Sequence, residues 1–131
     1  MDKVLVIEDN QMMRLFLVNY LGNDHDVSAV DSPSEALVWL ESNSASLIIS
    51  DYHKKDSTEF NQLKKVQSLS AWTNVPMIML TDNDKSDQRI NALEFGVADS
   101  MSKPFNPVEL NLRVHAVKKN NQMKVSYKTA S

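Results

Sequence analysis

The sequence contains no cysteine, only two glycines and no apolar run long enough to span a bilayer. The absence of cysteine excludes disulfides and thiolate metal sites, and it favours a reducing compartment such as the cytoplasm. A secretory signal peptide is not predicted either, because Glu8 and Asp9 interrupt the first apolar run. We therefore expect a cytoplasmic protein with no membrane segment.

Two further classes of site are not expected. The three histidines, His25, His53 and His115, lie far apart in the sequence and offer no zinc-like spacing. Residues 110–131 contain five cations and no acid, which gives this segment a charge of +5. The net charge of the whole chain is −3, so the other residues together carry a charge of −8. An acidic body repels phosphates, so direct binding of nucleic acid is not predicted. The basic end is interpreted as a helix that ends in cations, followed by a solvated tail.

What the sequence does contain is one repeating pattern over a length that fits a single globular domain. Short apolar runs, each followed by an amphipathic stretch, occupy residues 4–7, 26–30, 46–50, 75–80 and 97–101. Two helices are predicted at residues 13–21, ended by Gly22, and at residues 33–40, after a capping box at Ser32. Two more are predicted around Phe60, Leu63 and Val66, and around Ile90 and Leu93 up to Gly96. The last helix is predicted from Asn106 onward, with Leu110, Val114 and Val117 facing inward. This alternation predicts an α/β fold of (βα)5 type, with a parallel sheet and helices on both faces.

Polar residues follow four of the five predicted strands. They are Glu8 and Asp9 after the first strand, Asp51 after the third, Thr81 after the fourth and Lys103 after the fifth. Each has a simpler alternative, since Asp9 or Asn10 could cap the first helix, Thr81 could cap the fourth, and Lys103 could be a solvated loop residue. Because the carboxyl ends of parallel strands meet at one edge of a sheet, we expect these side chains to converge.

Converging carboxylates repel one another, and a magnesium ion with oxygen ligands relieves that repulsion. Lysine adds a second positive charge for a phosphoryl group, and a threonine hydroxyl can donate to a phosphate oxygen. An aspartate in this setting can act as a nucleophile that forms an acyl phosphate. Asp51 is the candidate, because it closes the central run and can lie between the metal and Lys103.

With these motifs, VLVIEDN, LIISD, PMIMLTD and SKPF, the chain resembles a response-regulator receiver domain of two-component signalling. The resemblance covers residues 2 to about 120, so residues 1–120 are assigned to the receiver domain and 121–131 to a tail or linker. It implies the flavodoxin-like three-layer sandwich, with a five-stranded sheet of order 2-1-3-4-5. Whether the receiver stands alone or belongs to a longer regulator is left open.

The resemblance also implies roles for the metal-binding residues. Asp51 would receive the phosphoryl group, from a sensor histidine kinase, a phosphotransfer protein or a small phosphodonor. Mg²⁺ would bind to Asp9, Asp51 and the backbone carbonyl of His53, while Glu8 would act through a water molecule. No enzymatic activity is implied beyond self-phosphorylation from a donor and slow autodephosphorylation.

Two further residues complete the machinery that the resemblance implies. Lys103 would pair with the phosphoryl group and would precede Pro104 through a cis peptide bond. Thr81 would swing toward the phosphoryl group, and this would switch a surface that binds an unidentified downstream protein.

The sequence departs from the family pattern at several positions. Lys54 and Lys55 replace a usual Met-Pro pair, and Glu59 replaces a usual glycine, so the loop loses both proline stiffness and glycine freedom. Asp82 replaces a small residue and is expected to place a carboxylate beside the incoming dianion. Ser100 replaces the switch aromatic, whose burial accompanies activation in the family.

Three other kinds of protein share features with a phosphoacceptor. An aspartate-nucleophile phosphatase would need a second acid two residues after the nucleophile, where this chain has His53. A flavodoxin-like mononucleotide binder is rejected, because the loop after the first strand is acidic where the anion would bind. A pseudo-receiver, which keeps the fold but acts as a phosphorylation-independent interaction module, remains the alternative.

Overall fold

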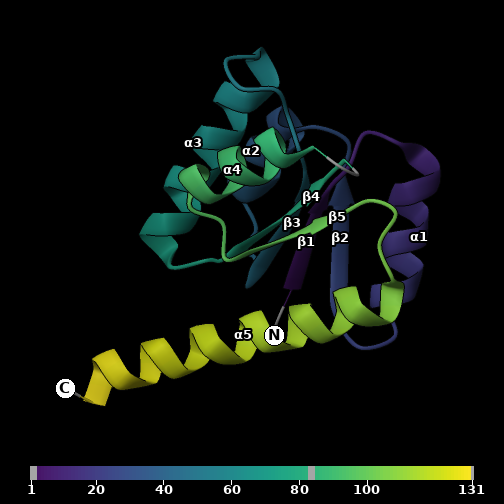
Figure 1. Cartoon of the computed structure of the whole chain (residues 1–131). Helices are drawn as coiled ribbons and strands as arrows, with labels where there is room; N and C mark the ends of the chain where they lie inside the picture. Colours follow the sequence, from purple (N-terminus) through teal and green to yellow (C-terminus); the bar gives the residue numbers. More distant parts are fainter. Residues whose placement is uncertain (1–2, 83–84, 131) are drawn as a thin grey trace.

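The computed structural model describes residues 3–82 and 85–130, without the side chains of 70–73 and 123–130 (Figure 1). Five strands alternate with five helices over these residues. The strands are β1 (Lys3–Ile7), β2 (Asp26–Val30), β3 (Leu47–Asp51), β4 (Met77–Thr81) and β5 (Asp99–Ser102). The helices are α1 (Gln11–Leu21), α2 (Pro33–Leu40), α3 (Thr58–Thr73), α4 (Ser86–Phe95) and α5 (Pro107–Ala130).

The strands form one parallel sheet of order β2-β1-β3-β4-β5, which confirms the predicted fold. The middle strands β1, β3 and β4 are mostly apolar, as expected for strands that helices cover on both faces. All four pairings keep the strands in parallel register, with Ile7 opposite Ser50 and Thr81 opposite Ser102. The carboxyl ends of β1, β3, β4 and β5 therefore open onto the same edge of the sheet.

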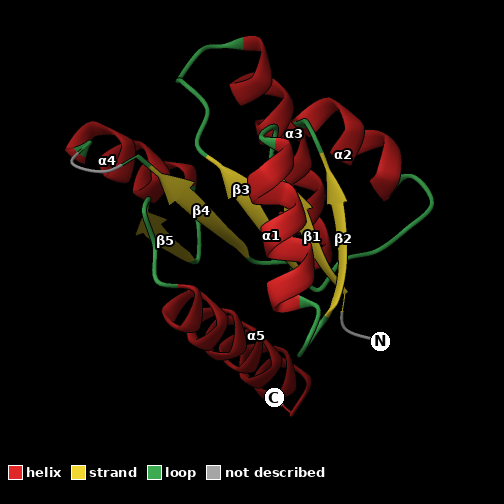
Figure 2. Cartoon of the chain, turned by 90° about the vertical axis from the view of Figure 1, so that its right-hand side faces the viewer, coloured by secondary structure: helices red, strands yellow, loops and turns green. Residues whose placement is uncertain are grey.

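Alternate residues of each strand serve two separate cores, one on each face of the sheet. Helices α2, α3 and α4 cover one face and α1 and α5 cover the other, as the two views together show (Figures 1 and 2). The first core includes Leu5, Ile7, Ile48, Ala36, Phe60, Leu63, Val66, Ala92 and Phe95. The second includes Val4, Val6, Ile49, Leu80, Leu17, Leu21, Leu110, Val114 and Val117.

Side-chain caps begin the helices where the sequence predicted them. The Asn10 side chain accepts a hydrogen bond from the backbone of Met13 (2.9 Å) at the start of α1. At the start of α2, the Ser32 hydroxyl accepts one from the backbone of Glu35 (3.1 Å). Helix α4 ends at Gly96, which adopts a left-handed conformation (φ 92°) that glycine tolerates without steric cost. Local sequence signals therefore fix these boundaries.

Two helices differ from the sequence interpretation. Ile90 and Leu93, whose spacing suggested the apolar face of α4, are 54% and 71% exposed, and the helix packs through Ala92 and Phe95 instead. Two apolar residues three apart mark a helix but do not determine which side of it faces the core. Helix α5 also continues to Ala130, through the segment assigned to a tail or linker. Among the residues described, no helix combines the length and the apolar character that crossing a membrane requires.

Two leucines on α5 test this packing directly, because Leu110 is fully buried and Leu112 is 61% exposed. We expect Leu110→Ala to lower the free energy of unfolding by about 2–5 kcal/mol, because it leaves a cavity beneath α5. The matched change Leu112→Ala should cost less than about 0.5 kcal/mol. Urea denaturation followed by circular dichroism measures both, and equal losses would contradict the inward face assigned to α5.

Candidate functional site

Three carboxylates meet at the carboxyl edge of the sheet. Glu8 and Asp9 directly follow β1, and Asp51 is the last residue of the neighbouring strand β3. One carboxylate oxygen from each residue lies within 4.8 Å of the others. The convergence that the parallel topology predicted is therefore present, and it concentrates negative charge at one point.

Lys103 contacts two of these carboxylates at once. Its Nζ donates to Asp51 Oδ1 over 2.7 Å and to Glu8 Oε1 over 3.2 Å. The Glu8 side chain is only 1% exposed, whereas those of Lys103 and Asp51 are 23% and 20% exposed. The backbone N–H of Lys103 also donates to the carbonyl of Thr81 (2.7 Å), which fixes the loop after β5 to the end of β4. The predicted cis peptide bond between Lys103 and Pro104 is confirmed.

The pKa values of Glu8 and Lys103 are both raised, for different reasons. Burial raises the pKa of Glu8 above its usual value, and the negative charge of Asp51 adds to the increase, although the Asn10 backbone and Lys103 oppose it. Burial alone would lower the pKa of Lys103, but its hydrogen bond to Asp51 and the charges of Asp51 and Glu8 outweigh this and raise it. Lys103 is therefore held as a cation, as pairing with a phosphoryl group requires.

Asp9 differs from the other two acids because its side chain is exposed. Its backbone carbonyl and that of Glu8 accept hydrogen bonds from Arg14 (3.4 and 2.9 Å), so the turn is fixed while the carboxylate faces solvent. The three acids offer only oxygen atoms, and among the described residues Lys103 is the cation that pairs with their carboxylates. An all-oxygen donor set with surplus negative charge fits a hard divalent cation such as Mg²⁺.

The hydroxyl of Thr81, at the carboxyl end of β4, makes its hydrogen bonds to β5. Thr81 is completely buried at the end of β4, so it is not the cap of α4. Its Oγ1 donates to the carbonyl of Met101 and shares a hydrogen bond with the hydroxyl of Ser102, both over 3.4 Å. Both distances are longer than is usual for a hydroxyl donor, so these bonds are weak.

The carboxylate of Asp82 is held by the first turn of α4. Its backbone N–H donates to Gln88 Oε1 (2.8 Å), and Gln88 Nε2 donates back to Asp82 Oδ2 (3.1 Å). Asp82 is exposed, and it is not part of the cluster formed by Glu8, Asp9 and Asp51. The repulsion of an incoming dianion that the sequence suggested is therefore still a prediction.

The loop after Asp51, which has Glu59 in place of the usual glycine, contains one residue with a positive φ. Asp56 takes up the left-handed conformation (φ 67°), which aspartate tolerates better than most residues. The Ser57 hydroxyl then accepts from the backbone of Phe60 (3.1 Å), and Glu59 lies in the first turn of α3. Burial lowers the pKa of the half-buried His53 in this loop, against the opposing charges of Asp51 and Glu59, and its Nε2 has no hydrogen-bond partner in the described part of the chain.

Comparison with known proteins identifies the arrangement. The family model of the response regulator receiver domain matches residues 4–115. The chain belongs to this family. The receiver domain is 30% identical to Chemotaxis protein CheY1 of Helicobacter pylori over 118 residues, which are 88% of this chain and 95% of that protein.

This receiver domain is also similar to part of a much longer protein and to a solved structure. It is 27% identical to Histidine kinase P4 of Formosa agariphila over 128 residues, and it spans 97% of its own length but only 9% of that kinase. A CheY-like response regulator receiver domain protein from Methanospirillum hungatei superposes with a TM-score of 0.81 at 18% identity, covering 95% of this chain and 98% of the other. This last likeness shows the shared fold.

Some contacts at the edge of this receiver domain were missed by sequence reasoning. Gln88 was not singled out, although it binds both the backbone and the carboxylate of Asp82. The pair formed by Asn91 and the Tyr52 hydroxyl (2.9 Å), which joins α4 to the loop after β3, was missed as well. No local pattern could have found either one, because each depends on how α4 packs against the sheet.

Proposed function

We propose that this receiver domain accepts a phosphoryl group on Asp51 and so relays a two-component signal. The observation that carries the proposal is the position of Asp51, whose Oδ1 lies 2.7 Å from Lys103 Nζ within a cluster of three carboxylates. Its side chain is 20% exposed, which leaves room for a donor to approach. The similarity to a histidine kinase supports a phosphohistidine donor, on a sensor kinase or a phosphotransfer protein.

The proposed transfer is a single displacement at phosphorus. A carboxylate oxygen of Asp51 forms the new P–O bond, while the bond between phosphorus and the donor's imidazole nitrogen breaks. The electron pair of that bond stays on the imidazole, which takes up a proton. Lys103 neutralises charge on the phosphoryl oxygens, in keeping with a reaction that depends mainly on positioning and electrostatics.

Mg²⁺ bound at this edge would neutralise charge on the phosphoryl group as well. Asp9, Asp51 and the backbone carbonyl of His53 would hold it directly. Glu8 would act through a water molecule, a role supported by the contacts its carboxylate already makes to Lys103 (3.2 Å) and to the Asn10 backbone (3.1 Å). The all-oxygen set is the kind that magnesium prefers.

Thr81 and Ser100 would determine how phosphorylation of Asp51 changes the shape of the protein surface. The two long hydrogen bonds of the Thr81 hydroxyl cost little to exchange for a bond to a phosphoryl oxygen. Ser100, half-buried in β5, has almost no apolar area to bury in response, so the change in shape should be smaller than with an aromatic residue. Exposed apolar residues on α4 and α5, Ile90, Leu93 and Leu112, offer a surface for a downstream protein.

Phosphorylation itself is the first test. With Mg²⁺ and a small phosphodonor such as acetyl phosphate, we expect the mass of the protein to increase by one phosphoryl group. Asp51→Asn should abolish the increase, because an amide cannot supply the carboxylate nucleophile. Intact-mass spectrometry detects the product, and peptide mapping locates it.

Asp56→Asn is the matched control, because Asp56 lies in the same loop and asparagine also tolerates its positive φ. This variant should be phosphorylated like the parent. Modification at Asp56 or Asp82 instead of Asp51 would contradict the assignment. A folded parent that takes no phosphate from any donor would favour the pseudo-receiver.

The metal assignment is tested by Asp9→Asn. Loss of one directly bound carboxylate should weaken Mg²⁺ binding by at least about tenfold. Isothermal titration calorimetry can measure this, with Asp56→Asn again as the control that removes a nearby charge outside the cluster. Unchanged affinity in Asp9→Asn would rule out this residue as a ligand.

The influence of Asp82 is tested by two substitutions that separate charge from shape. Asp82→Asn removes the negative charge but can still accept the hydrogen bond from Gln88, whereas Asp82→Ala loses both. If repulsion limits phosphorylation, both variants should raise the yield or slow dephosphorylation to a similar extent. A change in Asp82→Ala alone would instead assign the effect to the contact with α4.

A further inference from the structure

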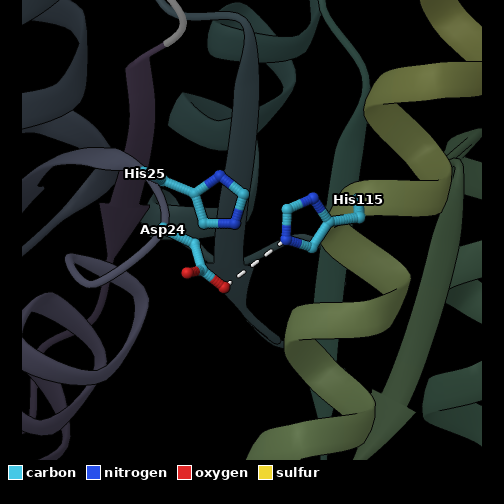
Figure 3. Close-up of side chains that lie close together, drawn as sticks. All are labelled: Asp24, His25 and His115. Carbon is cyan, nitrogen blue, oxygen red and sulfur yellow. Dashed lines mark ion pairs between the residues drawn. The ribbon is translucent and has the colours of Figure 1, made fainter.

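A second cluster of potential ligands lies away from the carboxyl edge (Figure 3). Asp24 and His25 stand in the turn just before β2, and His115 projects from α5. The turn precedes β2, so the cluster lies toward the amino ends of the strands, whereas Asp51 closes the carboxyl end of β3. His25 and His115, which are 90 positions apart, have no zinc-like spacing in the sequence, but the fold brings them together.

The geometry of the three side chains is close to that of a metal site. One ligand atom from each lies within 4.8 Å of the others, and the two imidazole ring centres are 4.7 Å apart. His115 Nε2 lies 3.5 Å from Asp24 Oδ2. That separation is long for a hydrogen bond, but it matches the edge of a tetrahedron of ligands around zinc, which is about 3.3 Å for bonds of about 2.0 Å.

The surroundings orient the ligands and leave room for an ion. The Asn111 amide donates to Asp24 Oδ2 (2.6 Å), and its Oδ1 lies 2.9 Å from His25 Nε2, so one side chain positions two of the three candidates. Hydrogen bonds of this kind fix ligand orientation in metal sites. The residues also line an open cavity of about 510 Å³, which is large enough for an ion and several waters.

An ordinary surface ion pair explains this arrangement less well. Asp24 and His115 are both exposed, and a pair of that kind contributes little stability. It would not account for His25, which presents a second imidazole to the same point and is held there by Asn111.

We propose that Asp24, His25 and His115 bind a Zn²⁺ ion, which would link α5 to the turn before β2. Two imidazoles and one carboxylate form a borderline donor set that favours zinc, copper or nickel over magnesium. The remaining coordination position would face the cavity and be filled by water. The two ends of the sheet would then bind two chemically different ions.

Lys118 is the feature that opposes this site. Its Nζ lies 3.1 Å from His25 Nδ1. For the bond to Asn111 to persist, His25 must carry its proton on Nε2 and bind zinc through Nδ1, the nitrogen that Lys118 contacts. The ammonium group would therefore have to move away, and it would also repel the ion. Lys118 therefore limits the affinity, and removing its charge should tighten binding.

Isothermal titration of the full chain with Zn²⁺, in excess Mg²⁺ to occupy the acidic edge, tests the proposal. We expect one ion per chain, and at least about tenfold weaker binding in His25→Gln and in His115→Gln. Lys118→Met should tighten binding about fivefold, because it removes a nearby positive charge. Circular dichroism of each variant checks the fold, and the gain in Lys118→Met cannot arise from misfolding.

His53→Gln is the control, because it removes the histidine that lies outside the cluster. Zinc affinity within about twofold of the parent in this variant supports the proposed site. The proposal fails if the parent binds no Zn²⁺, if Lys118→Met does not bind more tightly, or if His53→Gln weakens binding while His25→Gln does not. The last result would place the ion at the acidic edge.

Discussion

The contact of Lys103 with both Glu8 and Asp51 is the interaction on which the carboxyl edge depends. Glu8 is almost fully buried, and a buried carboxylate without a nearby cation is costly. The compensating ammonium comes from the loop after β5, at the other end of the chain, so the first and last strands must both be in place before the charges balance. The charges of the site therefore balance only in the folded sheet.

The two ends of the sheet differ in the chemistry that they present. The carboxyl edge gathers three carboxylates around one lysine, and the turn before β2 gathers two imidazoles and a carboxylate beside another lysine. Oxygen donors favour hard ions and imidazole favours borderline ones, so ligand type alone would keep the proposed Mg²⁺ and Zn²⁺ sites separate. Lysine has opposite effects at the two ends. Lys103 would stabilise the charge that a phosphoryl group brings, whereas Lys118 would compete with an incoming cation.

The sequence predicted what depends on neighbours along the chain or on parallel topology. Apolar runs predicted the strands, and Ser32 begins its helix as predicted because the cap bonds to a residue three positions on. Asn10, one of two candidate caps for the first helix, is the one that the structure uses. Convergence of Asp51 and Lys103 followed from the strand order. The sequence did not predict the inward face of α4, and it did not predict the meeting of His25 with His115. Both depend on how a helix packs against distant parts of the chain, which no local pattern records.

A phosphoryl group on Asp51, as proposed, would act first on the charge balance around Lys103. The phosphoryl group replaces one negative charge on Asp51 by about two. The Lys103 ammonium now lies 2.7 Å from Asp51 and 3.2 Å from Glu8, and the added charge would attract it more strongly toward Asp51. The buried carboxylate of Glu8 would then be stabilised more by its hydrogen bond from the backbone N–H of Asn10, the residue that caps α1. Because Ser100 provides little apolar area on the β5 side, we expect this route through Glu8 to the start of α1 to carry part of the change in shape.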